Sequence, residues 1–150
     1  MSRRKQCVLL SILLLLAAAA SPAPRDEPTV EGLKARISSA NVGDKPHLCV
    51  EVAQKQLKEA DRLYASGDLE KAEAALTDVV AYSELARDYS IQSHKYQKQS
   101  EIAVRGMTRK LTEILHTLGN ADQAAVKDAM SRLDRVRDDL LASMFKKGGK

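Results

Sequence analysis

Apolar residues recur at spacings of three and four positions through most of the chain after Pro46. This spacing places side chains on one face of an α-helix, whereas strands alternate apolar and polar positions. Neither strand-like alternation nor a further proline interrupts the pattern. The first segment, about 47–66, has an apolar face made of Val50, Ala53, Leu57, Ala60 and Tyr64. The sequence therefore predicts an all-α fold.

A heptad stripe runs through 69–118 without a change of register. Its positions seven apart are Leu69, Leu76, Ser83, Ser90, Gln97, Val104, Leu111 and Leu118, and those three residues further on are Ala72, Val79, Ala86, Ser93, Ser100, Met107 and Ile114. Because a constant heptad register is typical of an uninterrupted helix with coiled-coil-like packing, we expect one long central helix over about 69–118. The alternative is a break near 89–93, which would lay two oppositely charged halves side by side.

Glycines mark a chain reversal on either side of this helix. Gly67 can take the left-handed conformation that ends the first helix, and Asp68 can cap the next. Gly119 and Asn120 form a second stop-and-cap pair, after which a third helix is expected over 121–145. Its apolar face consists of Val126, Ala129, Leu133, Val136, Leu140 and Ser143. We expect antiparallel hairpins in which each outer helix covers half of the central one.

The first twenty residues have the three-part pattern of a secretory signal peptide. A basic segment, 1–6, precedes a charge-free apolar run of fourteen residues, 7–20, that ends in small residues. A membrane span needs about 20 apolar residues, so this run is too short for one. We expect cleavage after Ala20 and a secreted or periplasmic protein, with membrane attachment only if the signal peptide is retained.

The rest of the chain divides after Pro46. We expect 21–46 to be a proline-rich leader with one short helix, for which Thr29 is a suitable N-cap because its hydroxyl can accept a backbone N–H. We expect 47–145 to form the helical domain and 146–150 (KKGGK) to form a disordered basic tail.

Charge changes this picture in two ways. The whole chain has 24 basic and 20 acidic residues, but the expected signal peptide contains Arg3, Arg4 and Lys5 and no acid, which leaves 21 and 20. A chain so close to neutral lacks the electrostatic basis for general nucleic-acid binding. The remaining charge is also segregated: 51–88 has nine acidic and five basic residues, whereas 91–111 has six basic residues, one histidine included, and one acid. The dipole of one continuous helix favours this order.

Cysteine usage leaves Cys49 without a partner. Cys7 lies in the expected signal peptide, so Cys49 is the one cysteine of the mature chain. A lone cysteine cannot form an intramolecular disulfide in an oxidising compartment. Three interpretations stay open: a buried small apolar residue near a helix start, an intermolecular disulfide, or a reactive thiol beside His47.

Residues able to perform chemistry are few and scattered. Glu113 and His116 have the E-x-x-H spacing of di-iron carboxylate bundles, but such sites need two of these pairs and two further Glu residues. The heptad register points Ile114 inward and places this pair outside. Haem ligation by His94 or His116 with Met107 would lack a C-x-x-C-H motif. Without a Gly-rich phosphate loop or a Ser-His-Asp ordering, the sequence predicts no catalytic residue, no metal site, no cofactor and no enzyme.

The strongest candidate for binding is a tyrosine stripe. Tyr82, Tyr89 and Tyr96 are spaced by seven residues and share one side of the expected helix. They can wall the helix interface with their hydroxyls in water, or they can form a docking stripe for a partner helix or peptide. A basic rim beside the last tyrosine would suit an anionic partner. This rim consists of His94, Lys95 and Lys98.

The first reversal resembles one tetratricopeptide hairpin. The residues that carry the resemblance are Ala60, Tyr64, Gly67, Asp68, Leu69, Ala72 and Leu76, in the small, aromatic, glycine and alanine pattern of that repeat. The resemblance covers about 25–30 residues within 53–80, without the closing proline and without a second copy at the repeat period. It implies a helical scaffold that binds peptides or proteins.

These features together predict an exported, non-enzymatic helical protein that acts by self-association or by binding another protein through the long helix. Self-association is expected because a thin, Z-shaped layout leaves part of the heptad stripe exposed unless 29–40 or a second chain covers it. The alternative is an extracytoplasmic helical bundle that binds a small ligand or a metal.

Overall fold

The helices of this protein begin and end close to the glycine, proline and capping residues of its sequence. The computed structural model describes residues 27–146, which contain five α-helices, one short 3-10 helix and no strand. They are α1 (Val30–Ser39), α2 (Lys45–Ser66), α3 (Leu69–Ser93), α4 (Gln97–Thr117), the 3-10 helix η1 (Asn120–Asp122) and α5 (Ala124–Phe145). The all-α fold is therefore confirmed. The expected signal peptide and most of the expected basic tail lie outside the described residues.

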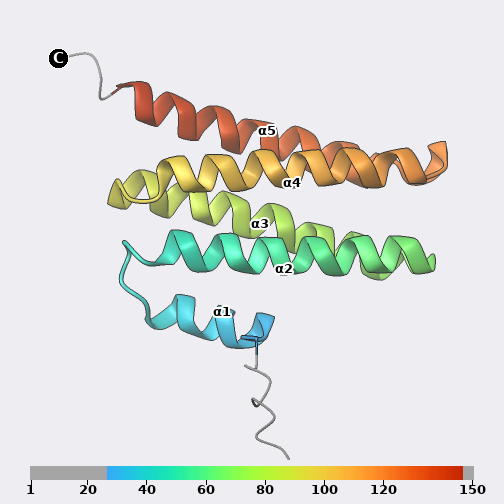
Figure 1. The fold of residues 1–150 in the computed structure, drawn as a ribbon, viewed down its shortest axis with the longest axis horizontal. Helices are drawn as coiled ribbons and strands as arrows, with labels where there is room; N and C mark the ends of the chain where they lie inside the picture. Colours follow the sequence, from blue (N-terminus) through green and yellow to red (C-terminus); the bar gives the residue numbers. More distant parts are fainter. Residues whose placement is uncertain (1–26, 147–150) are drawn as a thin grey trace, which may run out of the picture.

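Helices α2 to α5 form a four-helix bundle in which each helix runs back along the one before it (Figure 1). α2 packs on α3, α3 on α5, α5 on α4 and α4 on α2, so α2 and α5 occupy opposite corners and α2 and α4 are parallel neighbours. α1 lies outside the bundle, against α2 (Figure 1). The Z-shaped layout expected from the sequence is wrong, because the α2–α3 and α4–α5 hairpins close on each other.

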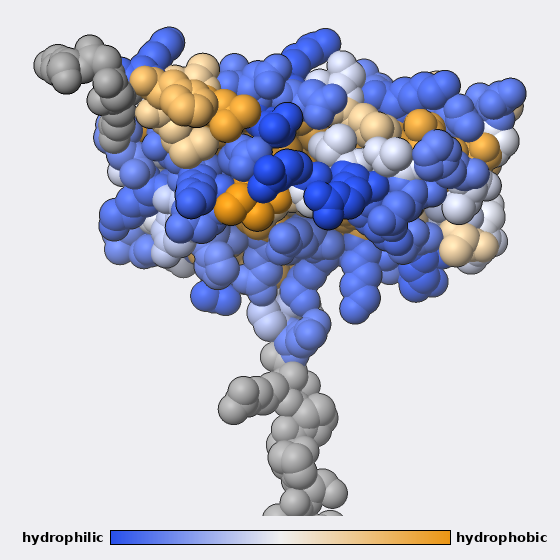
Figure 2. Space-filling model, turned by 45° about the horizontal axis from the view of Figure 1, so that its top comes forward, coloured by the Kyte–Doolittle hydropathy of each residue, from blue (hydrophilic) through white to orange (hydrophobic). Residues whose placement is uncertain are grey.

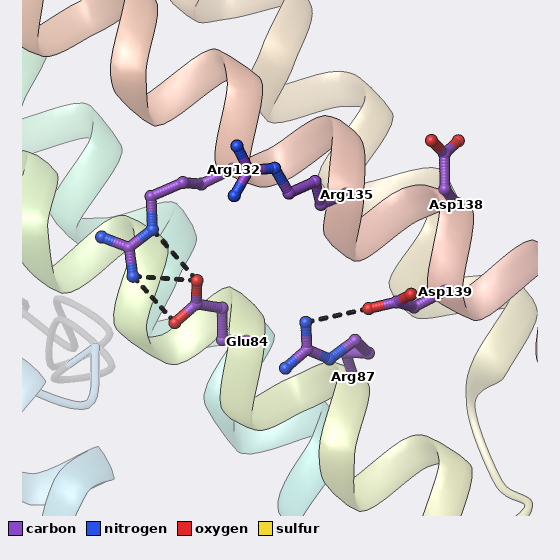
Figure 3. A pocket seen from close by; sticks show the side chains of 6 residues that line it. All are labelled: Glu84, Arg87, Arg132, Arg135, Asp138 and Asp139. Atoms are coloured by element: carbon purple, nitrogen blue, oxygen red, sulfur yellow. Dashed lines mark hydrogen bonds and ion pairs between the residues drawn. The ribbon is translucent and has the colours of Figure 1, made fainter.

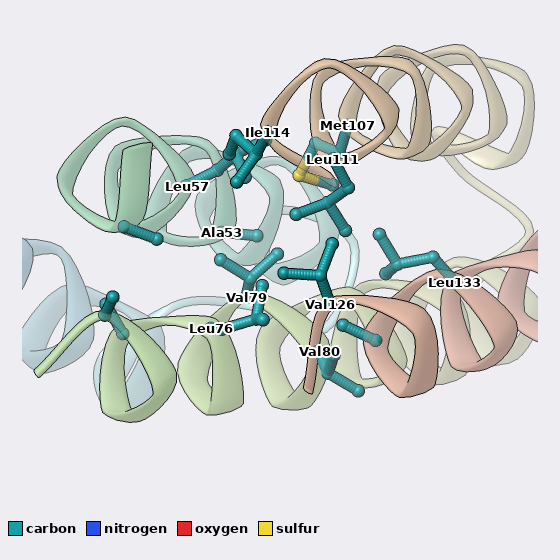
Figure 4. Close-up of a cluster of buried hydrophobic side chains, with 14 of the residues drawn as sticks. Ala53, Leu57, Leu76, Val79, Val80, Met107, Leu111, Ile114, Val126 and Leu133 are labelled. Carbon is teal, nitrogen blue, oxygen red and sulfur yellow. The ribbon is translucent and has the colours of Figure 1, made fainter. Parts of the chain in front are cut away.

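The core is built from aliphatic side chains on the inner faces of these four helices (Figure 4). Each of the four helices contributes to this core, for example through Leu57 of α2, Val79 of α3, Leu111 of α4 and Leu133 of α5. A fully buried Leu or Val side chain contributes about 1.5–3 kcal/mol to stability. Alanines on the same faces, such as Ala53 of α2, let the helix backbones approach closely, which suits a chain with one Phe and no Trp.

The single central helix expected over about 69–118 is wrong, because the chain reverses at 94–96. His94 and Tyr96 have φ of 57° and 60°, a left-handed backbone that the α-helix cannot continue through. The alternative interpretation placed a break near 89–93, and the observed reversal lies just after that range. The two halves are not joined by charge, however: among residues 27–146 no ion pair links α3 to α4, and α3 pairs instead with α1 and α5.

The heptad stripe nevertheless faces the interior on both sides of this reversal, since all of its members are buried or half-buried. Its polar members Ser83, Ser90, Gln97 and Ser100 are buried as well. From Ser93 to Gln97 the stripe advances four residues, which is an ordinary helical step. A constant register is therefore compatible with one helix and also with a tight reversal whose two arms both face the core.

The two glycine reversals differ. Gly67 ends α2 in the left-handed conformation, with φ 79°, and the Asp68 carboxylate accepts the Lys71 N–H at 3.4 Å to cap α3. Gly119 instead has extended backbone. The end of α4 is closed by the Gln123 side-chain amide, which donates to the carbonyl oxygens of Leu115 and Leu118 at 3.3 and 3.1 Å. The cap expected at Asn120 is wrong, because η1 occupies that position and α5 begins later, at Ala124.

The short helix expected within 21–46 is α1, and the Thr29 hydroxyl accepts the Gly32 N–H at 3.1 Å as its N-cap. Leu33 and Ile37 pack with Leu48, Cys49, Val52 and Ala86 in a second, smaller apolar cluster. This helix therefore covers the outer side of α2 and α3. None of the helices within 27–146 is long and apolar enough to cross a membrane.

Candidate protein-binding groove between α2 and α4

The tyrosine stripe is covered from within the chain. The Lys34 ammonium of α1 lies 5.4 Å from the centre of the Tyr82 ring, and the Lys45 ammonium of α2 lies 5.0 Å from that of Tyr89. Tyr96, which belongs to the left-handed reversal, stacks on His47 with ring centres 6.0 Å apart. Tyr82 and Tyr89 are half-buried, so these two rings wall an internal interface.

The basic rim expected beside Tyr96 is dispersed. His94, Lys95 and Lys98 are all exposed, but they point to different parts of the molecule. Lys95 lies against Gly43 in the α1–α2 loop, and His94 lines a hollow with Ile91 and the end of α5. Lys98 is on the exposed side of α4.

Cys49 is fully buried in the cluster under α1. Burial raises the pKa of its thiol from 9.0 to about 11, against a smaller lowering by Lys45. The thiol is therefore protonated at neutral pH, and the nucleophilic thiolate is scarce. An intermolecular disulfide at Cys49 would require the cluster to open first.

The residues considered for metal or haem are not brought together. Glu113 and His116 are exposed on α4, whereas Met107 is buried in the core. His94 lies in the α3–α4 turn, before α4 begins, whereas His116 lies in the last turn of α4. Residues 27–146 contain no group of three or more His, Cys, Asp or Glu side chains placed to hold a metal ion.

A groove of about 420 Å³ lies between α2 and α4, where two parallel helices meet. Its apolar lining includes Leu57 of α2 and Ile102, Ala103 and Met107 of α4. Gly106 is open to it: a Cβ at this position would have no heavy atom within 4 Å apart from the helix itself. Small residues at the helix contact thus leave a depression that side chains of this chain do not fill.

Ile102 is the exposed apolar residue of this groove, with 46% of its surface accessible. It does not belong to the heptad stripe, and it projects from α4 between basic residues. We call Lys98, Ile102, Arg105 and Arg109 the α4 outer face, because they recur at spacings of four, three and four residues. All four are exposed, and Glu113 is the one exposed acid of α4.

The charged residues that line the groove are Lys58, Asp61 and Lys110. Lys110 lies 3.0 Å from the Asp61 carboxylate of α2 and 3.3 Å from that of Glu113. Hydrogen bonds to these two carboxylates raise the pKa of Lys110, so it stays charged. Lys58 of α2 is an exposed lining residue of the groove. Lys98, Arg105 and Arg109 of the α4 outer face are exposed and lie beyond the residues that line the groove.

The opposite side of the bundle is closed by paired charges (Figure 3). The Arg132 guanidinium of α5 donates to both oxygens of Glu84 of α3 at 2.9 and 3.0 Å. Arg87 of α3 donates to Asp139 of α5 at 3.0 Å. The hollow between them, about 440 Å³, is lined by three arginines and three acids. Its balanced charge gives it no preference for an anion, so these residues chiefly join α3 to α5.

Hydrophobic surface elsewhere is confined to patches. Figure 2 shows a mainly hydrophilic face with a cluster of hydrophobic side chains at the end of the bundle where α5 ends. Phe145, the last residue of α5, is 77% exposed there.

Comparison with protein-family models, with curated proteins and with solved structures finds no match for this chain. The assignment of a function rests on the geometry of the chain itself. The groove combines an apolar floor, an open glycine and two lysines, and the cationic α4 outer face adjoins it. Sequence reasoning missed it because it lies between two helices, although Ile102, an exposed apolar residue outside the heptad stripe, was a visible signal.

Proposed function

We propose that this chain is an exported, non-enzymatic helical protein that binds an acidic, amphipathic helical segment of another protein in the α2–α4 groove. The observation that carries the proposal is the half-exposed Ile102, which lies both in an apolar groove and on the cationic α4 outer face. Exposed aliphatic side chains at the edge of a groove are typical anchors for a partner helix.

The shape of the groove supports a helix as the occupant. Ala103 and Gly106 carry little or no side chain, so a partner backbone can approach α4 closely at these positions. Leu57 and Met107 supply the apolar floor, and a methionine adapts readily to different side chains. A partner helix would place apolar residues at spacings of three and four against this floor.

Charge supports an acidic occupant. The groove and the neighbouring α4 outer face together carry five cations; two of them, Lys58 and Lys110, line the groove, and Lys110 is paired with Asp61 and Glu113. The five are Lys58, Lys98, Arg105, Arg109 and Lys110. A partner carrying Asp or Glu beside its apolar stripe would be attracted during encounter and oriented on binding.

Export is proposed from the sequence pattern of residues 1–20, a basic start followed by a short apolar run. A secreted or periplasmic protein purified after expression of the full chain should lack Met1 to Ala20 by intact mass. Retention of these residues would instead favour membrane attachment.

Binding can be tested with a fluorescent peptide of about 20 residues, long enough to form a helix, with Leu at the anchor positions and Glu elsewhere. Ile102→Glu places a like charge at the groove, so its dissociation constant should rise about tenfold or more, equivalent to 1.4 kcal/mol. Leu85→Glu is the matched control, since Leu85 is also exposed but lies on α3, outside the groove.

A peptide in which Lys replaces every Glu tests the charge argument separately. The proposal predicts weaker binding of this peptide than of the acidic one, and a steep loss of acidic-peptide binding as salt is raised. Equal binding of both peptides, or an Ile102→Glu variant that binds as well as the original chain, would overturn it.

A further inference from the structure

We infer that two copies of this chain exchange their α4–α5 hairpins, with α3 and α4 joined into one helix through 94–96. In the exchanged dimer, the hairpin of each copy packs on α2 and α3 of the other. The surface of α2 and α3 that the hairpin of the same copy leaves is thus covered by the hairpin of a second copy of this chain. This inference does not depend on the proposed function, because the α2–α4 groove forms in both arrangements.

The α3–α4 turn, which consists of His94, Lys95 and Tyr96, is the strained part of the fold. Its first and last residues, His94 and Tyr96, have positive φ; histidine adopts this conformation more readily than most residues, but for the bulky Tyr96 it is strained. No side chain caps the start of α4. Conversion of the turn to α-helix removes both left-handed residues and pairs the backbone groups left open at two helix ends. Short hinge loops under strain favour this kind of exchange.

The register makes a continuous helix compatible with the core. Ser90, Ser93, Gln97 and Ser100 follow one another at spacings of three, four and three residues across the turn. If the turn becomes helical, the inner faces of α3 and α4 lie on the same side of the joined helix. Each half then meets the same partners as before, with some of them supplied by the other copy.

Contacts between the two exchanged parts are re-formed rather than lost. Glu84 with Arg132, Arg87 with Asp139, and Asp61 with Lys110 would each link residues of different copies. The contacts that do not survive are those of the turn itself, such as the stacking of Tyr96 on His47.

A separate observation points to the end of the bundle at which the turn lies. The α1–α2 loop, the α3–α4 turn and the end of α5 all lie at this end (Figure 1). Each contributes an exposed apolar residue: Val42 at 38%, Tyr96 at 39% and Phe145 at 77%. A helix that continues through 94–96 brings two bundles together end to end, so the second copy would cover this surface.

Ser90 and Ser100 provide the decisive test. Their hydroxyl oxygens are 3.0 Å apart inside the bundle, and both residues are buried. In a Cys7→Ser, Cys49→Ala background of the full chain, Ser90→Cys and Ser100→Cys are made separately, then unfolded and refolded together at high concentration. Exchange predicts a disulfide-linked heterodimer by intact mass, and no linked dimer when either variant is refolded alone. Dimers without this cross-link would be ordinary surface dimers and would overturn the inference.

The turn gives a second, independent test by light scattering on a sizing column. His94→Gly with Tyr96→Gly relieves the strain and should raise the dimer dissociation constant about tenfold or more. His94→Ala with Tyr96→Ala keeps the strain and favours helix, so it should lower that constant. Gln92→Gly with Gln99→Gly, at exposed helical positions, is the matched control. Equal dimer fractions for the glycine and alanine pairs, or monomers alone at every concentration, would contradict exchange.

Discussion

Gly67 and Gly106 both have room for a side chain, but the backbone is left-handed at Gly67 and α-helical at Gly106. Gly67 closes α2 with φ 79°, and its N–H contacts the carbonyl oxygens of Leu63 and Tyr64. Gly106 lies inside α4. Apart from adjacent backbone, neither position has a heavy atom within 4 Å of where a Cβ would stand. Crowding is thus absent at both residues, and conformation alone separates them.

Alanine should therefore have opposite effects at these two positions. Gly67→Ala forces an L-residue into the left-handed region and should lower the free energy of unfolding by about 1–2 kcal/mol. Gly106→Ala removes a flexible residue from a helix and should raise that free energy by up to about 1 kcal/mol. Urea denaturation followed by circular dichroism measures both changes. A loss of similar size in the two variants would show that the space at Gly106 is not free.

At the scale of helices, α5 is joined to its neighbours by arginines that meet carboxylates of different burial. Arg137 donates to Glu101 of α4 at 2.9 Å, and the Glu101 side chain is 9% exposed. Arg132 binds Glu84 of α3, whose side chain is 31% exposed. A carboxylate that loses its partner in a buried position is solvated poorly, whereas water replaces the partner of an exposed one.

Removing these two arginines should therefore have unequal consequences. We expect Arg137→Ala to lower the free energy of unfolding by about 2–3 kcal/mol, because the Glu101 carboxylate keeps only the distant Arg105 at 3.9 Å. We expect Arg132→Ala to cost about 1 kcal/mol or less. Glu101→Gln combined with Arg137→Ala should recover part of the loss, as measured by urea denaturation. Equal losses for the two arginines would contradict the role given to burial.

Helix class and core positions could be predicted from sequence because helical spacing depends on residues close together in the chain. Leu111 and Leu133 were placed on inner faces by spacing alone, and both are fully buried. The turn at 94–96 entered the sequence analysis only as the alternative break near 89–93, since neither a glycine nor a proline marks it. The heptad stripe continued across it, so the pattern gave no indication of a reversal.

The candidate groove was harder to predict than the fold, because it depends on which helices become neighbours. The reversal at 94–96 places α4 beside α2, and only then do Gly106 and Leu57 line one depression. A continuous helix would have carried Tyr96 in the tyrosine stripe, whereas the reversal stacks it on His47. The turn that the sequence did not reveal thus created the α2–α4 groove and also removed Tyr96 from the predicted tyrosine stripe.

At the scale of the whole molecule, the core is divided into two clusters of unequal size. The larger one joins α2, α3, α4 and α5, and the smaller one joins α1 to the outer sides of α2 and α3. α1 is held by Leu33 and Ile37 and by an ion pair of 2.9 Å between Lys34 and Asp78. A ten-residue helix with so few attachments can detach while the four-helix bundle stays folded.

Cys49 reports on this detachment, because its thiol is fully buried in the smaller cluster. We expect Leu33→Asp, which places a charge in that cluster, to raise the rate of Cys49 labelling by a maleimide about tenfold or more while the bundle stays folded. Ala35→Asp is the matched control, since Ala35 is on the exposed side of α1. For Leu33→Asp, the loss of helical signal in circular dichroism should be no larger than the contribution of the ten residues of α1. Labelling that accelerates only in denaturant, together with the unfolding of all helices, would mean that α1 and the bundle open as one unit.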